Sequence, residues 1–104
     1  ATTVIGGVGA DMLTLQGAVN TLTVSDSDGL SITGGAGIDT ITFSTLAIAT
    51  VDSGTGADKL TLGNFANILT LSDSDGISVT GGTNIDTIIF STVVTATTII
   101  GGTG

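Results

Sequence analysis

Aspartate is the residue type in this chain whose number and spacing could do chemistry. All nine acidic residues are Asp, whereas the chain has one Lys, no Arg and no His, and its net charge is −8. The stretch SDSDG occurs twice, at 25–29 and 72–76. Clustered carboxylates without counter-charges are oxygen ligands of the kind that a hard cation such as Ca²⁺ takes. Without His or Cys, the chain lacks the commonest general base and a thiol nucleophile, and we expect no enzymatic activity.

The composition also argues against several kinds of partner. A strongly acidic chain lacks the Lys and Arg that phosphate groups require, so we expect no nucleic acid partner. No apolar run approaches the length of a transmembrane segment, and nothing suggests a small-molecule substrate. An apolar content of 40% argues against disorder, and the absence of Cys excludes disulfides and thiolate metal sites. The first residues resemble the middle of a repeat, so we expect a segment of a longer protein.

Internal repetition organises the chain. Residues 1–47 match the residues 47 positions later at 28 positions. ATTIIGGTG at the end of the chain resembles ATTVIGGVG at its start. The sequence therefore predicts one solenoid segment, 1–104, made of two repeats, 1–47 and 48–95, and a stub, 96–104.

Within each repeat, apolar residues alternate with Thr and Ser in short runs separated by Gly, Asn and Asp. This period of two predicts five short strands per repeat, and no stretch has helical periodicity. The expected inward pairs of the first repeat are Leu13 and Leu15, Leu22 and Val24, Leu30 and Ile32, and Ile41 and Phe43. Short, similar strands at this spacing predict an all-β parallel β-solenoid without helices, in coils of about 18–19 residues.

The glycine-rich turns bear on the number of sheets. These turns are GGVGAD, GGAGID, SGTGAD and GGTNID, at 6–11, 34–39, 53–58 and 81–86. In a two-sided coil the second and third turns stack with SDSDG of 72–76 on one edge. The first turn then stacks with SDSDG of 25–29 on the opposite edge, where the fourth turn and the terminal GGTG follow. A three-sided coil would instead pair the first turn with the second; we expect two sides.

Stacked acidic turns raise a physical problem that a cation would solve. Successive coils lie about 4.8 Å apart, so Asp ladders would repel one another, and Lys59 is the only cation. Ca²⁺ binds six to eight oxygens from carboxylates and backbone carbonyls, and glycine turns expose carbonyls. We therefore expect Ca²⁺ between coils. Asp52 is a weaker candidate than the eight Asp of the turns, which are Asp11, Asp26, Asp28, Asp39, Asp58, Asp73, Asp75 and Asp86.

The glycine-rich turns resemble the nonapeptide GGxGxDxUx of RTX proteins. GGAGIDTIT (34–42) and GGVGADMLT (6–14) match every fixed position, whereas SGTGADKLT (53–61) lacks the first Gly and GGTNIDTII (81–89) has Asn84 in place of Gly. The resemblance implies a right-handed β-roll exported by type I secretion and folded in extracellular calcium. It also implies that the motif Asp and the loop carbonyls bind Ca²⁺: Asp11, Asp39, Asp58 and Asp86, with Gly7, Gly9, Gly35, Gly37, Gly54, Gly56 and Gly82.

RTX nonapeptides usually run in tandem, whereas here uncharged turns such as LQGAVN (15–20) and FSTLA (43–47) interrupt them. We therefore expect about two ions per cluster of three acidic turns. The composition is similar to that of bacterial surface-layer proteins and giant secreted adhesins. This similarity predicts a structural segment on the bacterial surface or in the biofilm matrix: an S-layer, an extracellular filament or an adhesin stalk. Its expected partners are calcium ions, and further repeats or copies end to end.

Other interpretations remain beside this one. The chain could be the calcium-binding folding module of a type I-secreted enzyme or toxin, although the 47-residue repeat argues against it. It could be an ice-binding adhesin region if Thr14, Thr23, Thr42, Thr61 and Thr70 form an outward ladder. The Asp-Gly turns could also be turns without metal. SDSDG lacks the closing Glu and the helices of an EF-hand, and no Lys follows GGVGAD as a phosphate loop requires.

Two smaller patterns complete the sequence. Asn20 and Asn67 recur at equivalent turns and predict a ladder of turn-stabilising amides. Met12 and Ile89, with Ile5 and Ile100, are expected to face outward and to make lateral contacts.

Overall fold

A computed structural model describes residues 2–26, 28–73, 75–92 and 97–104. The middle serines of both SDSDG turns, Ser27 and Ser74, lie outside the described residues, and so does the predicted repeat boundary at 95–96. Within the described residues the fold is an all-β solenoid with two parallel sheets and no helix, as the sequence predicts.

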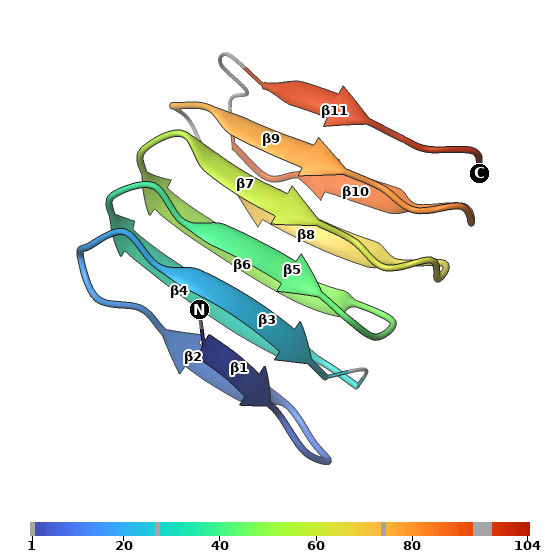
Figure 1. Ribbon diagram of the computed structural model, residues 1–104, viewed down its shortest axis with the longest axis horizontal. Coiled ribbons are helices and arrows are strands. Elements are labelled where there is room, and N and C mark those ends of the chain that lie inside the picture. Colours follow the sequence, from blue (N-terminus) through green and yellow to red (C-terminus); the bar gives the residue numbers. More distant parts are fainter. Residues whose placement is uncertain (1, 27, 74, 93–96) are drawn as a thin grey trace.

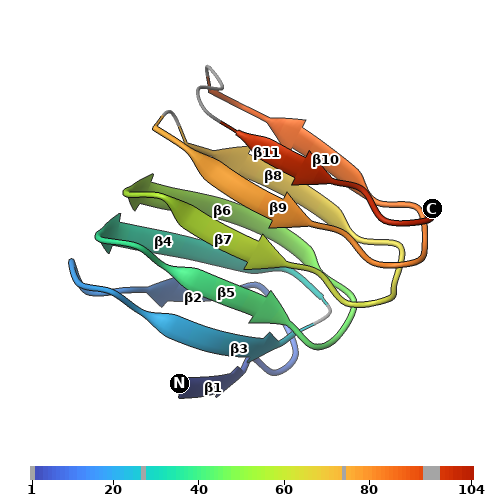
Figure 2. The ribbon, with the colours of Figure 1, turned by 45° about the horizontal axis from the view of Figure 1, so that its top comes forward.

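The chain alternates strictly between the two sheets, which lie one behind the other in Figure 1. The described strands of the odd sheet are β1 (Thr2–Ile5), β3 (Thr21–Ser25), β5 (Thr40–Phe43), β7 (Asp58–Thr61), β9 (Ile77–Thr80) and β11 (Thr98–Ile100). Those of the even sheet are β2 (Asp11–Thr14), β4 (Leu30–Ala36), β6 (Ile48–Thr55), β8 (Ile68–Ser72) and β10 (Thr87–Phe90). Figure 2 separates the two layers, with the chain ends at opposite ends of the stack.

Each strand pairs in parallel with the strand two positions later in the chain. Thr21 lies opposite Thr40, and Thr40 opposite Lys59, an offset of 19 residues. Between β6 and β8 the offset is 20, because Ile48 lies opposite Ile68. The predicted two-sided coil is confirmed, with coils of 19 or 20 residues. Since each 47-residue repeat holds five strands, equivalent strands of the two repeats lie in opposite sheets, as β3 and β8 do.

The alternating apolar residues form a thin core between the sheets. The predicted pairs of β3, β4 and β5 are buried, whereas Leu13 and Leu15 are only half-buried because β2 is a terminal strand of its sheet. The buried apolar residues are Leu22, Val24, Leu30, Ile32, Ile41, Phe43, Ala47, Ala49, Val51, Leu60, Leu62, Leu69, Leu71, Ile77 and Val79.

The turns gather at two edges, named here as they lie in Figure 1. The left edge carries the turns that lead from even to odd strands, at 15–20, 34–39, 53–58 and 72–76. The right edge carries those that lead from odd to even strands, at 6–10, 25–29, 43–47, 62–67 and 81–86. The predicted stacking is confirmed: GGAGID, SGTGAD and the second SDSDG share the left edge, and GGVGAD and the first SDSDG share the right edge.

Candidate metal-binding turns

The eight turn Asp fall into two groups. Asp28 and Asp75 are exposed. The other six have buried or half-buried side chains inside the turns: Asp11, Asp26, Asp39, Asp58, Asp73 and Asp86. The sequence did not separate the groups, because the alternation of a strand does not extend through a turn. Asp52, the weaker candidate, is exposed in β6.

The left edge holds the fullest stack of carboxylates. Asp39 and Asp58 are 0% and 1% exposed, and they occupy the same place in successive coils. The backbone N–H of Asp39 donates to Oδ1 of Asp58 at 2.8 Å. In the next coil Asp73 is also buried, and its Oδ2 accepts a hydrogen bond from the Ser53 hydroxyl at 2.5 Å. Three buried carboxyl groups therefore follow one another along this edge.

The second oxygen of several of these carboxylates has no hydrogen-bond partner. Among the described residues, the buried unpaired oxygens are Oδ2 of Asp11, Asp26, Asp39 and Asp58. Leaving a buried carboxylate oxygen unpaired is costly, and native proteins almost always provide a partner or an ion. The sole cationic side chain, Lys59, is exposed on β7 and points away from the interior. These oxygens therefore fit a cation better than they fit any group of the chain.

The right edge carries the corresponding pair from the first repeat. Asp11 and Asp26 approach each other beside Gly6. A Cβ at Gly6 would overlap Oδ2 of Asp26 and would lie 2.8 Å from Oδ2 of Asp11. At the equivalent position of the second repeat, Ser53 places a hydroxyl instead, and that hydroxyl binds Asp73. Because Gly6 has no side chain, Oδ2 of Asp11 and Oδ2 of Asp26 face the same space, and no hydrogen-bond donor of the described residues fills it.

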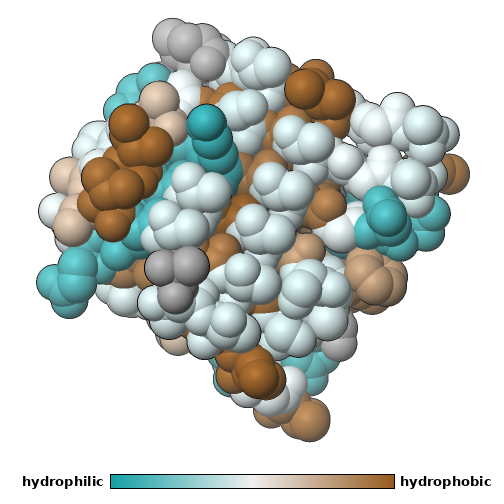
Figure 3. Space-filling model, in the orientation of Figure 1, coloured by the Kyte–Doolittle hydropathy of each residue, from teal (hydrophilic) through white to brown (hydrophobic). Residues whose placement is uncertain are grey.

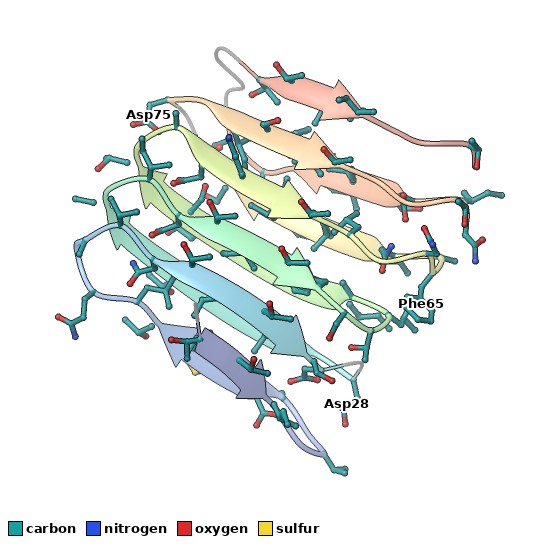
Figure 4. The ribbon with its side chains drawn as sticks, in the orientation of Figure 1. Asp28, Phe65 and Asp75 are labelled. Atoms are coloured by element: carbon teal, nitrogen blue, oxygen red, sulfur yellow. The ribbon has the colours of Figure 1, made fainter. Side chains whose placement is uncertain are left out.

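Asp28 and Asp75 connect neighbouring coils directly. Oδ2 of Asp28 accepts a hydrogen bond from the Gly9 N–H at 2.8 Å, and Oδ2 of Asp75 accepts one from the Gly56 N–H at 3.0 Å. Both glycines have positive φ, at 116° and 130°. Figure 4 shows the two aspartates at opposite edges. In each SDSDG turn the first Asp instead closes its own turn, since Oδ1 of Asp73 accepts the Asp75 N–H at 2.9 Å.

Asp86 is the one motif Asp with both oxygens hydrogen-bonded in the described structure. Its Oδ1 accepts from the side-chain amide of Asn67 at 2.8 Å, and its Oδ2 accepts from the Gly82 N–H at 3.1 Å. Asn20 binds Oδ1 of Asp39 in the same way, also at 2.8 Å. Both Asn stabilise their turns as predicted, but they lie on opposite edges. The predicted ladder between them is therefore wrong.

The glycine carbonyls named by the resemblance face the neighbouring coil. Gly35 lies opposite Gly54 in the ladder of β4 and β6. A Cβ at Gly54 would overlap the carbonyl oxygen of Gly35, and a Cβ at Gly56 would overlap that of Gly37. Only glycine permits this approach. The carbonyls thus join the carboxylates between coils, the mixed oxygen set that Ca²⁺ takes. Gly7, Gly9 and Gly82 hold the corresponding turn positions on the right edge. The described residues contain no group of three or more Asp, Glu, His or Cys side chains arranged to hold a metal ion by themselves.

Burial changes the protonation of two of these carboxyl groups. It raises the pKa of Asp58, and the nearby charges of Asp39 and Asp73 raise it further against the opposing hydrogen bond from the Asp39 N–H. Burial likewise raises the pKa of Asp26, against the hydrogen bond from the Asp28 N–H, and the side chains of Asp28 and Asp11 raise it further. The Gly9 N–H lowers the pKa of the exposed Asp28. The carboxyl groups of Asp26 and Asp58 thus resist ionisation, as expected where no cation compensates them.

These shifts give a pH dependence for the metal-free protein. A carboxyl group with a raised folded pKa binds protons more tightly in the folded state, so its contribution to the free energy of unfolding grows as the pH falls. Asp28 has a lowered pKa in the folded state, so its contribution to the free energy of unfolding is lost as the pH falls. That loss occurs only below the pKa of an unfolded Asp, about 3.9. We expect the melting temperature of the chelator-treated protein to rise from pH 7 to about pH 4.5. Calorimetry at the two pH values measures this shift, and a lower melting temperature at pH 4.5 would contradict it.

The predicted threonine ladder is divided between the two sheets. Thr23, Thr42 and Thr61 lie side by side on the odd sheet, in one rank with Thr3 and Thr80. Thr14 and Thr70 belong to the even sheet, where they occupy different ranks. A single ladder of the five predicted Thr is therefore wrong, because the sequence interpretation ignored which sheet each strand joins. Figure 3 looks onto the odd sheet, whose surface consists largely of pale side chains of intermediate hydropathy.

The predicted outward apolar residues are exposed. Met12 and Ile89 lie on the outer face of the even sheet, and Ile5 and Ile100 belong to terminal strands of the odd sheet. On the even sheet, Met12, Ile48 and Ile68 line an open groove of about 420 Å³. This face is more apolar and less regular than the rank of Thr on the odd sheet.

Searches against protein-family models, curated proteins and solved structures found no match to this chain. The likeness to RTX proteins thus rests on the quoted nonapeptides and on the solenoid fold. In the part of the chain that the structure describes, no helix could cross a membrane.

Proposed function

We propose that this chain is a calcium-stabilised structural segment of a secreted bacterial surface or matrix protein. The observation that carries the proposal is the set of four buried Asp oxygens without hydrogen-bond partners, two at each edge. Ca²⁺ between successive turns would bind these oxygens together with the facing glycine carbonyls. On the left edge, Asp39, Asp58 and Asp73 span three turns and hence two gaps between coils, enough for two ions.

Calcium would add stability to a fold whose core is thin. An ion that binds only the folded state stabilises it by RT ln(1 + [Ca²⁺]/Kd). Extracellular modules bind calcium with a Kd on the order of 10⁻⁴–10⁻³ M, so millimolar calcium suffices. In the far lower calcium of the cytosol, repulsion among the Asp would favour the extended chain that type I secretion requires. The ion thus links folding to arrival outside the cell.

The role we propose is mechanical. Both sheets run the length of the molecule, and their terminal strands, β1 and β11 in one sheet and β2 and β10 in the other, each lack a neighbour on one side. Further coils could pair there and extend the rod, whether they belong to the same chain or to another copy. A rod of this kind suits an S-layer, an extracellular filament or an adhesin stalk.

Limited proteolysis tests this function. The chain should resist a non-specific protease in millimolar CaCl₂ and be cleaved rapidly in a chelator or when Mg²⁺ replaces Ca²⁺. The protease must itself be calcium-independent, and an unrelated β-solenoid without Asp turns controls for its activity. Equal resistance in all three conditions would refute a calcium-stabilised segment.

The rank of Thr on the odd sheet favours ice binding as a second candidate function. Five hydroxyls and methyl groups repeat at the strand spacing of about 4.8 Å, a flat and regular surface on which water can order. The neighbouring rank, Thr21, Thr40, Lys59, Ser78 and Thr98, is interrupted by the charge of Lys59. Thermal hysteresis of the calcium-loaded chain tests this candidate, and its absence would exclude it.

A further inference from the structure

The side-chain amides of Asn20 and Asn67 donate hydrogen bonds to backbone carbonyls of their own turns. In the acidic turns, the equivalent carbonyls have no such donor and face the next coil. Nδ2 of Asn20 lies 3.0 Å from the Gln16 carbonyl, 2.8 Å from the Ala18 carbonyl and 2.8 Å from Oδ1 of Asp39. Asn67 makes the same three contacts one repeat later, with the Gly63 and Phe65 carbonyls at 3.1 and 2.9 Å and with Asp86 at 2.8 Å. Each amide nitrogen thus sits among three oxygens.

Asp39 occupies, in the next coil, the position that Asn20 occupies in its own coil. Asn20 precedes Thr21, Asp39 precedes Thr40, and these two Thr are paired. The backbone contacts are also the same, since the Asn20 N–H donates to Oδ1 of Asp39 and the Asp39 N–H donates to Oδ1 of Asp58. The side chains differ in one atom: Asn has an N–H donor where Asp has an oxygen. That oxygen, Oδ2 of Asp39, is buried and unpaired.

The oxygens around this position correspond from coil to coil. Gly35 and Gly37 lie against the carbonyls of Gln16 and Ala18, so their own carbonyls hold the equivalent place one coil further along. In a turn with Asn, the side-chain N–H groups of the Asn supply the donors between these oxygens. Asp39 instead adds an unpaired oxygen acceptor to two carbonyls and the Asp of the next coil, and an external cation can balance that set.

We propose that Asn20 and Asn67 are built-in substitutes for a calcium ion, and that Asn or Asp at this turn position decides whether the gap to the next coil takes an ion. The inference rests on the proposed function, because it assigns where the calcium sites begin. Asn20 ends the stack of left-edge sites before Asp39. On the right edge, Asn67 holds the same place before Asp86, whose two carboxylate oxygens are already hydrogen-bonded within the chain. The number of ions per chain is then set by these residues.

A different neutral side chain, a Thr of the next coil, follows each SDSDG turn. The Asp26 N–H donates to the Thr45 hydroxyl at 3.1 Å, and the Asp73 N–H donates to that of Thr92 at 3.0 Å. Thr92 also donates to the Asp73 carbonyl at 3.1 Å. Beyond the SDSDG turn the chain therefore again supplies its own hydrogen bonds. On the left edge, three acidic turns lie between the Asn20 turn and Thr92.

Two opposite substitutions in the full chain test the proposal. Asp39→Asn should place an amide in the first gap, remove one bound calcium and raise the metal-free melting temperature by on the order of 10 °C. Asn20→Asp should add one bound calcium and lower the metal-free melting temperature by a similar amount. Gln16→Glu, which adds the same charge at an exposed position of the Asn20 turn, should change neither quantity.

Calcium per folded chain is counted by native mass spectrometry, and melting is followed in chelator. An unchanged count in both variants, with calcium bound to the original chain, would overturn the inference and leave the proposed function intact. A lower metal-free melting temperature in Asp39→Asn would overturn it independently of any bound ion. An original chain that binds no calcium would overturn the proposed function, and the inference with it.

Discussion

Replacing Asp58 by Ala should remove most of the stability that the proposed calcium ions add to the left edge of the solenoid. Asp58 lies between Asp39 and Asp73, so its carboxylate borders both gaps between the three acidic turns of this edge. At calcium concentrations about 10- to 100-fold above Kd, each ion contributes about 1.4–2.7 kcal/mol, and loss of both sites costs about 3–5 kcal/mol. Urea unfolding in about 10 mM CaCl₂, roughly 10- to 100-fold above a Kd of 10⁻⁴–10⁻³ M, measures this difference.

The same substitution should have a small effect in chelator. Ala removes the acceptor of the Asp39 N–H, which is destabilising, and it also removes a buried carboxylate whose pKa is raised, which is stabilising. Asp52→Ala is the matched control, because Asp52 is exposed and carries the same charge. Equal losses for Asp58→Ala with and without calcium would show that Asp58 acts only through the fold.

Replacing Phe43 by Ala should destabilise the protein by about 3–5 kcal/mol, the usual cost of emptying a buried aromatic site. Phe43 is 2% exposed and ends β5 in the middle of the odd sheet. A small domain with a thin core lies near the lower end of the usual stability of about 5–15 kcal/mol, so this loss should remove most of the stability of the metal-free protein. The calcium concentration at half-folding should rise accordingly, because binding must then supply more of the folding free energy.

Phe65→Ala is the control for this prediction. Phe65 is 41% exposed on the right edge, where Figure 4 shows it pointing away from the sheets, and its loss should cost less than about 1 kcal/mol. Comparable losses at both positions in urea unfolding would contradict a core centred on β3 to β9.

The fold followed from the sequence because two simple periods determine it. Alternation in runs such as TLTVS and TITF placed Leu22, Val24, Ile41 and Phe43 inside, and the structure buries all four. The spacing of 19 between GGAGID and SGTGAD placed these turns on one edge. Both patterns can be recognised in the sequence because each coil has nearly the same backbone path as the coil before it.

The site was less predictable because turn geometry is local. Asp26 and Asp28 are two residues apart, yet one is buried and the other is exposed. In the second SDSDG turn, the N–H of Asp75 donates to Oδ1 of Asp73, which turns the two side chains to different sides. The Thr ladder could have been placed from the sequence by counting strands, since Thr14 and Thr70 belong to even strands.

The role of the Asn turns depended on seeing the two repeats in three dimensions. Asn20 and Asn67 recur at the same place in each repeat, which the sequence shows. That each amide nitrogen meets two carbonyls and the Asp of the next coil is visible only when the coils are stacked. In the proposal, the difference between Asn and Asp, one donor in place of one acceptor, distinguishes a gap that the chain closes itself from one that takes a cation.

Far-UV circular dichroism during a CaCl₂ titration of the chelator-treated chain, held just above its metal-free melting temperature, tests the central claim most directly. The account predicts a transition from a coil spectrum to a β spectrum near millimolar calcium, which Mg²⁺ does not reproduce because it requires a smaller and more rigid octahedral site. A coil spectrum that calcium leaves unchanged at this temperature would contradict the account. The buried aspartates would then be tolerated by a solenoid held together by its strand ladders and its core alone.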